Sequence, residues 1–231
     1  MHSGGAGTPT AIGEPVFLDS LNAAELSGLE SHGIKRTYVR GHALFHEQGA
    51  ADRVLVLLSG FVKLSRLSEE GREVILAIRG PGDLLGEQSA LDGRPRSATA
   101  TALDPVTAIV LSSDEFVRLL EKEPRVALVV LKMLSHRLRE ADVKRMELSL
   151  QDATARVAAR ILELARRFGE DSGGDLEIPL PISQEELAGW TGCSRDSVVK
   201  ALQAMRNAGW IETGRRRITV RDLEALRRRA E

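Results

Sequence analysis

The chain has 231 residues, with 32 basic and 33 acidic side chains and a formal net charge of −1. This length fits one large domain or two small ones, and a hydrophobic content of 42% is enough to bury a core. No stretch approaches the ~20 apolar residues that a membrane helix needs, and the first residues do not resemble a secretory signal. The single cysteine excludes an intramolecular disulfide framework and a cysteine-only metal or iron–sulfur cluster within one chain, and it favours a reducing, cytoplasmic compartment.

The balanced total charge hides one basic segment. Residues 193–221 carry seven basic and two acidic side chains, whereas residues 1–150 carry 18 basic and 20 acidic ones. A local excess of positive charge is the electrostatic footprint of a nucleic-acid partner. The net charge of −1 therefore does not exclude such a partner.

The N-terminal part of the chain has the pattern of a small β domain. Residues 1–14 are expected to form a disordered tail, and a helix is expected to begin at Asp19-Ser20. The following apolar runs alternate with glycine and proline turns, without helical periodicity between them: LFHE, VLVLLSG, FVKLSRL, EVILAIRG, SATATAL and VTAIVL. They predict an antiparallel β-barrel or jelly roll within residues 15–123, closed by a helix that ends before Pro124.

Residues 124–151 are predicted to form one long helix and a hinge. Its apolar side chains follow one another mostly at alternating spacings of four and three residues, at Ala127, Leu131, Leu134, Leu138, Ala141 and Leu148. Such a seam either packs against the chain's own barrel or pairs with the same helix of a second copy. The strongly polar flanks favour the second arrangement, a homodimer held by a parallel coiled coil.

The pattern from Asp152 to residue 231 is mainly helical. Asp152 is a good N-cap for a helix that ends at Gly169, and a polar, glycine-rich loop is expected after it. Two short helices, Ser183–Trp190 and Ser194–Gly209, flank a glycine-containing turn, which is the pattern of a helix-turn-helix unit. The segment WIETGRRRITV then predicts a two-stranded wing with its turn near Gly214. The fold class expected for the whole chain is α+β.

Residues 86–99 read GEQSALDGRPRSAT and form the first candidate site. Free backbone N–H groups at a helix start favour an anion, and an arginine fork matches phosphate oxygens. A glutamate in the same pocket accepts a hydrogen bond from a ribose hydroxyl. One loop thus combines hydrogen-bond donors for a phosphate with a hydrogen-bond acceptor for a ribose hydroxyl, which predicts a nucleotide-like ligand.

The same segment resembles the phosphate-binding cassette of cyclic-nucleotide-binding domains, in Gly-Glu, then Ala-Leu, then Gly-x-Pro-Arg-Ser-Ala-Thr. The resemblance implies that Glu87 binds the ribose 2′-hydroxyl and Arg96 the cyclic phosphate, with Gly86 and Ser97 completing the cradle. Gln88 departs from the usual residue at its position and either adds a polar contact or fills the turn.

The resemblance is weaker where the nucleobase would bind. The family's base-contacting pair corresponds to Ala141-Asp142, of which only Asp142 can form a side-chain hydrogen bond, and Arg137 corresponds to an arginine that can reach Glu87. Cyclic AMP is the expected effector, although the nucleobase itself is undecided. No metal, haem or iron–sulfur cluster is expected, because the chain has one cysteine and its histidines show no metal-ligand spacing.

Residues 182–211 resemble the helix-turn-helix of the cyclic-AMP-receptor/FNR superfamily, whose recognition helix begins with Cys-Ser-Arg, an acidic residue, Ser or Thr, and Val. Arg195 can read guanine and Asp196 cytosine, and Lys200 reaches a base edge or a phosphate. Aspartate and lysine replace the glutamate and arginine of the cyclic AMP receptor protein, which predicts a relaxed form of a TGTGA palindrome. The predicted phosphate contacts are Ser183, Ser194, Ser197, Arg215, Arg216 and Arg217.

Both motifs and the order of the parts identify the chain as a member of this superfamily of transcription regulators. The resemblance implies a homodimer that binds double-stranded DNA, contacts RNA polymerase and responds allosterically to cyclic AMP, with neither enzymatic activity nor a membrane partner. One alternative is a regulator of the same family that is active without ligand or with a different effector. A more distant alternative is a cyclic-nucleotide regulatory subunit of an enzyme, against which the winged helix argues.

Overall fold

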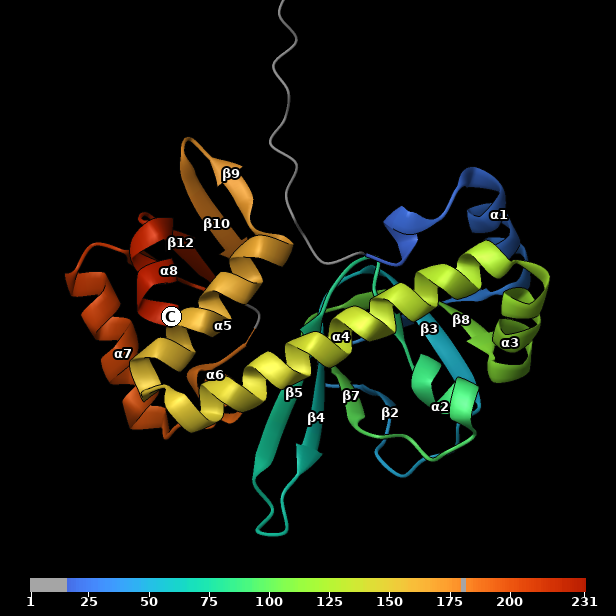
Figure 1. The fold of residues 1–231 in the computed structure, drawn as a ribbon, viewed down its shortest axis with the longest axis horizontal. Coiled ribbons are helices and arrows are strands. Elements are labelled where there is room, and N and C mark those ends of the chain that lie inside the picture. Colours follow the sequence, from blue (N-terminus) through green and yellow to red (C-terminus); the bar gives the residue numbers. More distant parts are fainter. Residues whose placement is uncertain (1–15, 180–181) are drawn as a thin grey trace, which may run out of the picture.

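The computed structural model describes residues 16–179 and 182–231. The tail predicted for residues 1–14 lies outside these described residues. A β barrel and a smaller, mainly helical C-terminal half are joined by one long helix (Figure 1). This arrangement confirms the predicted α+β fold of barrel, long helix and winged helix-turn-helix.

The barrel strands are β1 (Ile34–Tyr38), β2 (Ala43–Phe45), β3 (Arg53–Ser59), β4 (Val62–Leu67), β5 (Glu73–Arg79), β6 (Leu84–Leu85), β7 (Thr99–Ala102) and β8 (Val106–Ser112). They form two antiparallel sheets with the orders β1-β8-β3-β6 and β2-β7-β4-β5, and apolar side chains from both sheets fill the space between them. The six apolar runs of the sequence correspond to β2, β3, β4, β5, β7 and β8. The sequence does not predict β1, which exposes four of its five side chains, or β6, which has only two residues.

Short helices pack against the barrel: η1 (Leu18–Ser20), α1 (Ala23–His32), α2 (Glu87–Asp92) and α3 (Ser113–Lys122). The prediction that the first α-helix begins at Asp19-Ser20 is wrong, because Asn22 is its N-cap. The Asn22 side chain accepts a hydrogen bond from the Glu25 backbone N–H (2.9 Å), and the Glu25 carboxylate accepts one from the Asn22 N–H (2.8 Å). This reciprocal capping box satisfies two helix-end donors, which Asp19 cannot do from its place in the preceding turn.

Helix α4 (Pro124–Leu150) has the predicted bounds and runs from the barrel to the C-terminal half (Figure 1). Val126, Val130 and Met133 are buried against the barrel core. In the predicted seam, by contrast, Leu131 is 62% and Leu138 65% exposed. The barrel therefore covers one side of α4 and leaves much of a second apolar side open.

The C-terminal half contains α5 (Ala153–Phe168), β9 (Glu170–Ser172), β10 (Asp175–Pro179), α6 (Gln184–Thr191), α7 (Arg195–Asn207), β11 (Ile211–Gly214), β12 (Arg217–Val220) and α8 (Leu223–Ala230). Its strands form one antiparallel sheet in the order β11-β12-β10-β9. The polar loop predicted after Gly169 is in fact the β9–β10 hairpin. Gly173 and Gly174 adopt positive φ in its turn, and β10 pairs with β12, which local polarity does not indicate.

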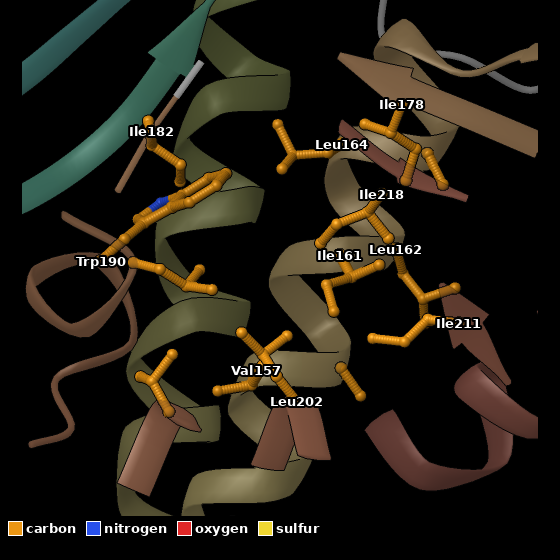
Figure 2. Close-up of a cluster of buried hydrophobic side chains, with 14 of the residues drawn as sticks. Val157, Ile161, Leu162, Leu164, Ile178, Ile182, Trp190, Leu202, Ile211 and Ile218 are labelled. Carbon is orange, nitrogen blue, oxygen red and sulfur yellow. The ribbon is translucent and has the colours of Figure 1, made fainter. Parts of the chain in front are cut away.

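The core of the C-terminal half extends into the barrel. Side chains of α5, α7, β10 and β12 converge in it (Figure 2), and Ile75 and Ile78 of β5 belong to the same buried cluster. At its edge, the rings of Phe61 and Phe168 meet edge to face with their centroids 4.9 Å apart. The two halves therefore share apolar packing, and removing one from the other would expose part of both cores.

Candidate functional site

The first candidate site is built where β6 turns into α2. Gly86 adopts a left-handed φ of +83° at this turn, and a Cβ atom there would lie 2.6 Å from Arg96 Nη1. Only glycine combines this backbone conformation with so close an approach of a side chain. The Gly-Glu of the motif thus brings the start of α2 directly against Arg96.

Arg96 is buried to 1% exposure, and backbone carbonyls surround its guanidinium. Nε donates to Ala50 O (3.0 Å), Nη1 to Gly86 O (3.0 Å), and Nη2 to Arg53 O (2.6 Å) and Asp52 Oδ1 (3.3 Å). Burial lowers the pKa of the guanidinium, and the hydrogen bond to Asp52 opposes this effect. Because arginine remains protonated in proteins, the site carries a fixed positive charge. The sequence gives no signal for the carbonyls of Ala50 and Arg53, which lie 46 and 43 residues before Arg96.

Glu87 and Arg137 form a buried ion pair beside this charge. Glu87 is 3% exposed, and its Oε1 accepts a hydrogen bond from Arg137 Nη1 at 2.7 Å. Arg137 also donates to Leu84 O at 3.0 Å, which fixes α4 against the end of β6. The structure thus contains the predicted link between Arg137 and Glu87. This contact fixes the orientation of the Glu87 carboxylate, whose other oxygen remains an acceptor.

A cleft of about 840 Å³ opens over these groups. It brings together all the predicted ligand-binding residues except one: Gly86, Glu87, Gln88, Arg96, Ser97, Arg137 and Ala141 line it. Asp142 does not, because the helical rotation between neighbouring residues of α4 turns it outward, where its side chain is 61% exposed and lies 3.9 Å from Arg145. Within one chain, the predicted base-contacting pair is therefore split.

The cleft continues to the helix-turn-helix unit, where Trp190, Cys193 and Ser194 also line it. Gly192, at φ +64°, ends α6, and the turn leads into α7. Ser183 and Ser194, predicted as phosphate contacts, are N-caps of α6 and α7 and accept hydrogen bonds from backbone N–H groups, each at 3.1 Å. These two hydroxyls therefore have a structural role.

Helix α7 divides into a buried and an exposed side. Val198, Leu202 and Met205 are buried. The predicted base-reading residues Arg195, Asp196 and Lys200 are exposed near the start of the helix, and Ser197 is half-buried between them. The short, positively charged face is thus accessible from outside the chain.

The wing has its turn next to Gly214, as predicted. Its tip is Arg215-Arg216, beyond Gly214, and the left-handed conformation belongs to Arg216, at φ 60°. The Arg216 side chain donates to Leu103 O of the barrel at 3.4 Å, and that of Arg217 donates to Glu177 of β10 at 3.4 Å. Arg215 is exposed. Two of the three predicted wing contacts thus have partners within the chain.

Comparison with known proteins identifies the family. Residues 35–123 match the cyclic nucleotide-binding domain and residues 155–229 the Crp-like helix-turn-helix domain. A CRP-like cAMP-activated global transcriptional regulator of Mycobacterium tuberculosis is 37% identical over 193 residues, which cover 84% of this chain and 86% of that protein. The chain belongs to the CRP/FNR family of transcription regulators.

A further relative agrees with this assignment, and a solved structure has the same fold. The cyclic AMP receptor protein of Thermus thermophilus is 33% identical over 214 residues, 93% of this chain and 95% of that protein. The structure of FixK2 from Bradyrhizobium japonicum has the same fold, with a TM-score of 0.78 over 86% of this chain and 98% of FixK2 at 24% identity. Among the described residues, no helix is long and apolar enough to cross a membrane.

In this CRP/FNR chain, polar contacts also tie the DNA-binding half to the barrel. Lys63 of β4 lies 2.8 Å from Glu73 of β5 and 2.8 Å from Glu186 of α6. A Cβ atom on Gly189 of α6 would lie 2.8 Å from Glu73 O, so glycine permits this close approach. Burial alone would raise the pKa of Glu186, but hydrogen bonds from Lys63 and Ser183 bring it below its ordinary value of 4.5.

The Glu186 contact predicts a pH-dependent stability. A carboxyl whose pKa is lowered on folding stabilises the protein above its unfolded pKa, and this contribution disappears as pH falls through the folded pKa. We expect Glu186→Gln, which keeps the capping-box geometry, to reduce the free energy of unfolding by ~1 kcal/mol near neutral pH. In urea unfolding, the difference should shrink below about pH 4.5, the unfolded value. Glu185→Gln, an exposed neighbour, is the control, and a pH-independent difference would contradict this prediction.

Proposed function

We propose that the chain is a homodimeric, sequence-specific DNA-binding regulator that a cyclic nucleotide, cyclic AMP above all, controls allosterically. The observation that carries the proposal is the convergence of Glu87 and Arg96 on one cleft at the start of α2. This pairing supplies a fixed positive charge and an oriented acceptor within one site. It suits a ligand that carries an anion and a hydroxyl close together, as a cyclic nucleotide does.

Each group has a defined part in ligand binding. The Arg96 guanidinium would meet the cyclic phosphate, for which a charge-assisted contact is strong. Glu87 would accept the ribose 2′-hydroxyl, since its Oε1 is already held by Arg137 and its other oxygen remains an acceptor. Gly86 provides the close approach, and Ser97 and Gln88, whose side chains lie 3.4 Å apart, edge the cradle. No metal, haem or iron–sulfur cluster has a part in this mechanism.

The preference for cyclic AMP rests on relatives rather than on base contacts. The regulator of M. tuberculosis is described as cAMP-activated, and the protein of T. thermophilus as a cyclic AMP receptor protein. Ala141 offers the nucleobase no side-chain hydrogen bond. Asp142 turns away from the cleft of its own chain, so any contact from it would reach the cleft of a second copy.

One observation favours a second candidate, a regulator of the same family that is active without ligand or with another effector. The Arg96 guanidinium already donates to three carbonyls and to Asp52. A guanidinium so engaged also stabilises the loops by itself. A relative whose name mentions no cyclic nucleotide supports this alternative: a global nitrogen regulator of Synechocystis is 29% identical over 195 residues.

DNA binding would follow from the exposed start of α7. Arg195 can donate to guanine O6 and N7, Asp196 can accept from cytosine N4, and Lys200 can reach a base or a phosphate one turn later. A two-fold dimer through α4 would present two such helices to half-sites one helical turn apart, as in a TGTGA-like palindrome. Contact with RNA polymerase and action in the cytoplasm complete the proposed role, which is binding and not catalysis.

The effector site is tested by calorimetry with cyclic AMP and cyclic GMP. We expect micromolar binding of cyclic AMP to the wild type and at least ~100-fold weaker binding to Glu87→Gln and Arg96→Lys. The uncharged amide is a weaker acceptor than the carboxylate, and the ammonium cannot make the forked contact of the guanidinium, although both variants keep a side chain of similar size. Arg94→Ala removes an exposed arginine from the same loop and should bind normally. Absence of heat with both nucleotides in the wild type would sink the proposal and favour the second candidate.

The DNA site is tested by fluorescence anisotropy on a TGTGA palindrome in the presence of cyclic AMP. Arg195→Ala should lose about 1–3 kcal/mol of binding, roughly 5- to 150-fold, because a bidentate arginine–guanine contact is worth that much. Arg206→Ala, which changes the last turn of the same helix, should lose much less. The assignment would be overturned if Arg195→Ala bound the palindrome as tightly as the wild type and discriminated equally well against a scrambled site.

The homodimer is tested by sedimentation velocity. Leu138 lies on the open side of α4 and is 65% exposed, whereas Leu67 is 68% exposed on the barrel. We expect twice the monomer mass for the wild type and for Leu67→Glu, but a monomer for Leu138→Glu, because a charge in an apolar seam is costly. A Leu138→Glu dimer as tight as the wild type would rule out this seam.

A further inference from the structure

Four charged side chains form a buried chain from the nucleotide cleft to the DNA-binding half. Glu87 belongs to α2, Arg137 to α4, Asp83 to the turn between β5 and β6, and Arg167 to the last turn of α5. Their side chains are 4%, 13%, 7% and 6% exposed, respectively. The charges of this group therefore act on one another with little screening by water.

The contacts within this chain differ in length. Arg137 Nη1 lies 2.7 Å from Glu87 Oε1, but Arg137 Nη2 lies 3.7 Å from Asp83 Oδ1, beyond hydrogen-bond distance. Asp83 Oδ2 accepts from Arg167 Nη2 at 2.6 Å and from the Gly80 backbone N–H at 2.8 Å. Arg137 thus stands between two carboxylates and is bonded closely to only one of them.

Arg167 anchors α5 to the barrel through this chain. Besides its contact with Asp83, its Nη1 donates to Ile78 O of β5 at 3.2 Å. Phe168, the next residue, packs on Phe61. The end of α5 is therefore held where Asp83 holds Arg167, and a weaker Asp83 contact would loosen this end of the helix.

We propose that Asp83 and Arg167 are positioning residues that transmit occupancy of Glu87 to the DNA-binding half. A ribose hydroxyl that donates to the other oxygen of Glu87 draws negative charge away from Oε1, and this weakens the hold of Oε1 on Arg137 Nη1. Arg137 then closes the gap to Asp83 Oδ1, so the charge of Asp83 is shared between two guanidinium groups and its hold on Arg167, and through it on α5, weakens. This inference rests on the proposed cyclic-nucleotide site, since it assigns the pathway that leads from that site.

The test replaces Arg167 by methionine, which has similar length but no charge. If Arg167 restrains the unliganded protein, Arg167→Met should bind the TGTGA palindrome more tightly without cyclic AMP. The ratio of DNA dissociation constants without and with cyclic AMP should fall at least ~5-fold relative to the wild type, the lower end of typical coupling. Arg167→Lys, which keeps the charge beside Asp83, should restore most of the ratio.

Arg166→Met is the matched control, because it removes an exposed arginine from the same turn of α5. Its ratio should equal that of the wild type. A merely structural role of Arg167 predicts weaker DNA binding in both conditions with an unchanged ratio, and that result would overturn the proposal. Thermal unfolding of each variant shows whether the fold is retained, and the lysine variant provides the test where methionine unfolds the protein.

A second measurement needs no nucleotide. Glu87→Gln weakens the hold on Arg137 directly, so amide hydrogen exchange should rise at Gly80, whose N–H bonds to Asp83, and in residues 164–169. Unchanged exchange there, with cyclic AMP binding intact in the wild type, overturns the pathway but leaves the proposed function standing. Raised exchange in Glu87→Gln supports the pathway. It does so even if calorimetry detects no binding of cyclic AMP to the wild type, because that second result contradicts only the proposed function.

Discussion

The burial of two arginine side chains organises the cleft and the loops around it. Arg96 and Arg137 lie largely out of water, and a guanidinium is tolerated there only where acceptors surround it. The loop between β2 and β3, the turn before α2 and the end of β6 supply those acceptors. Segments far apart in the sequence are thus held by shared positive charges. The same interaction that stabilises the loops leaves an oriented, charged cleft between the barrel and α4.

Two kinds of contact join the DNA-binding half to the barrel, and they differ in what they permit. The shared apolar core is held mainly by the hydrophobic effect, which is non-directional, so its surfaces tolerate small shifts at little cost. Ion pairs such as Lys63–Glu186, at 2.8 Å between β4 and α6, require particular distances and are either made or broken. An apolar core crossed by ion pairs therefore favours a few defined arrangements over a continuum, which is the property an allosteric regulator needs.

Local patterns predicted much of this molecule because they reflect local physics. The alternating apolar runs predict most of the barrel strands, and the heptad spacing predicts the length of α4. One motif predicts that Glu87 and Arg96 converge. Contacts between distant segments left no such signal. Nothing in the sequence near Asp83 indicates that Arg167, 84 residues later, will donate a hydrogen bond to it. Likewise, nothing near Arg216 indicates that its side chain will donate to the backbone carbonyl of Leu103. The β9–β10 hairpin was missed for the same reason, since its pairing with β12 and not its own polarity makes it a strand pair.

The wing is part of a four-stranded sheet, and this bears on the thermodynamics of any contact its turn makes. An isolated two-stranded ribbon is marginal in water and would lose conformational freedom when it met a surface. Here β12 is paired with β10 as well as β11, so most of that freedom is lost during folding. The turn at Arg215 is thereby pre-organised, and its contact with a surface would cost little further conformational entropy.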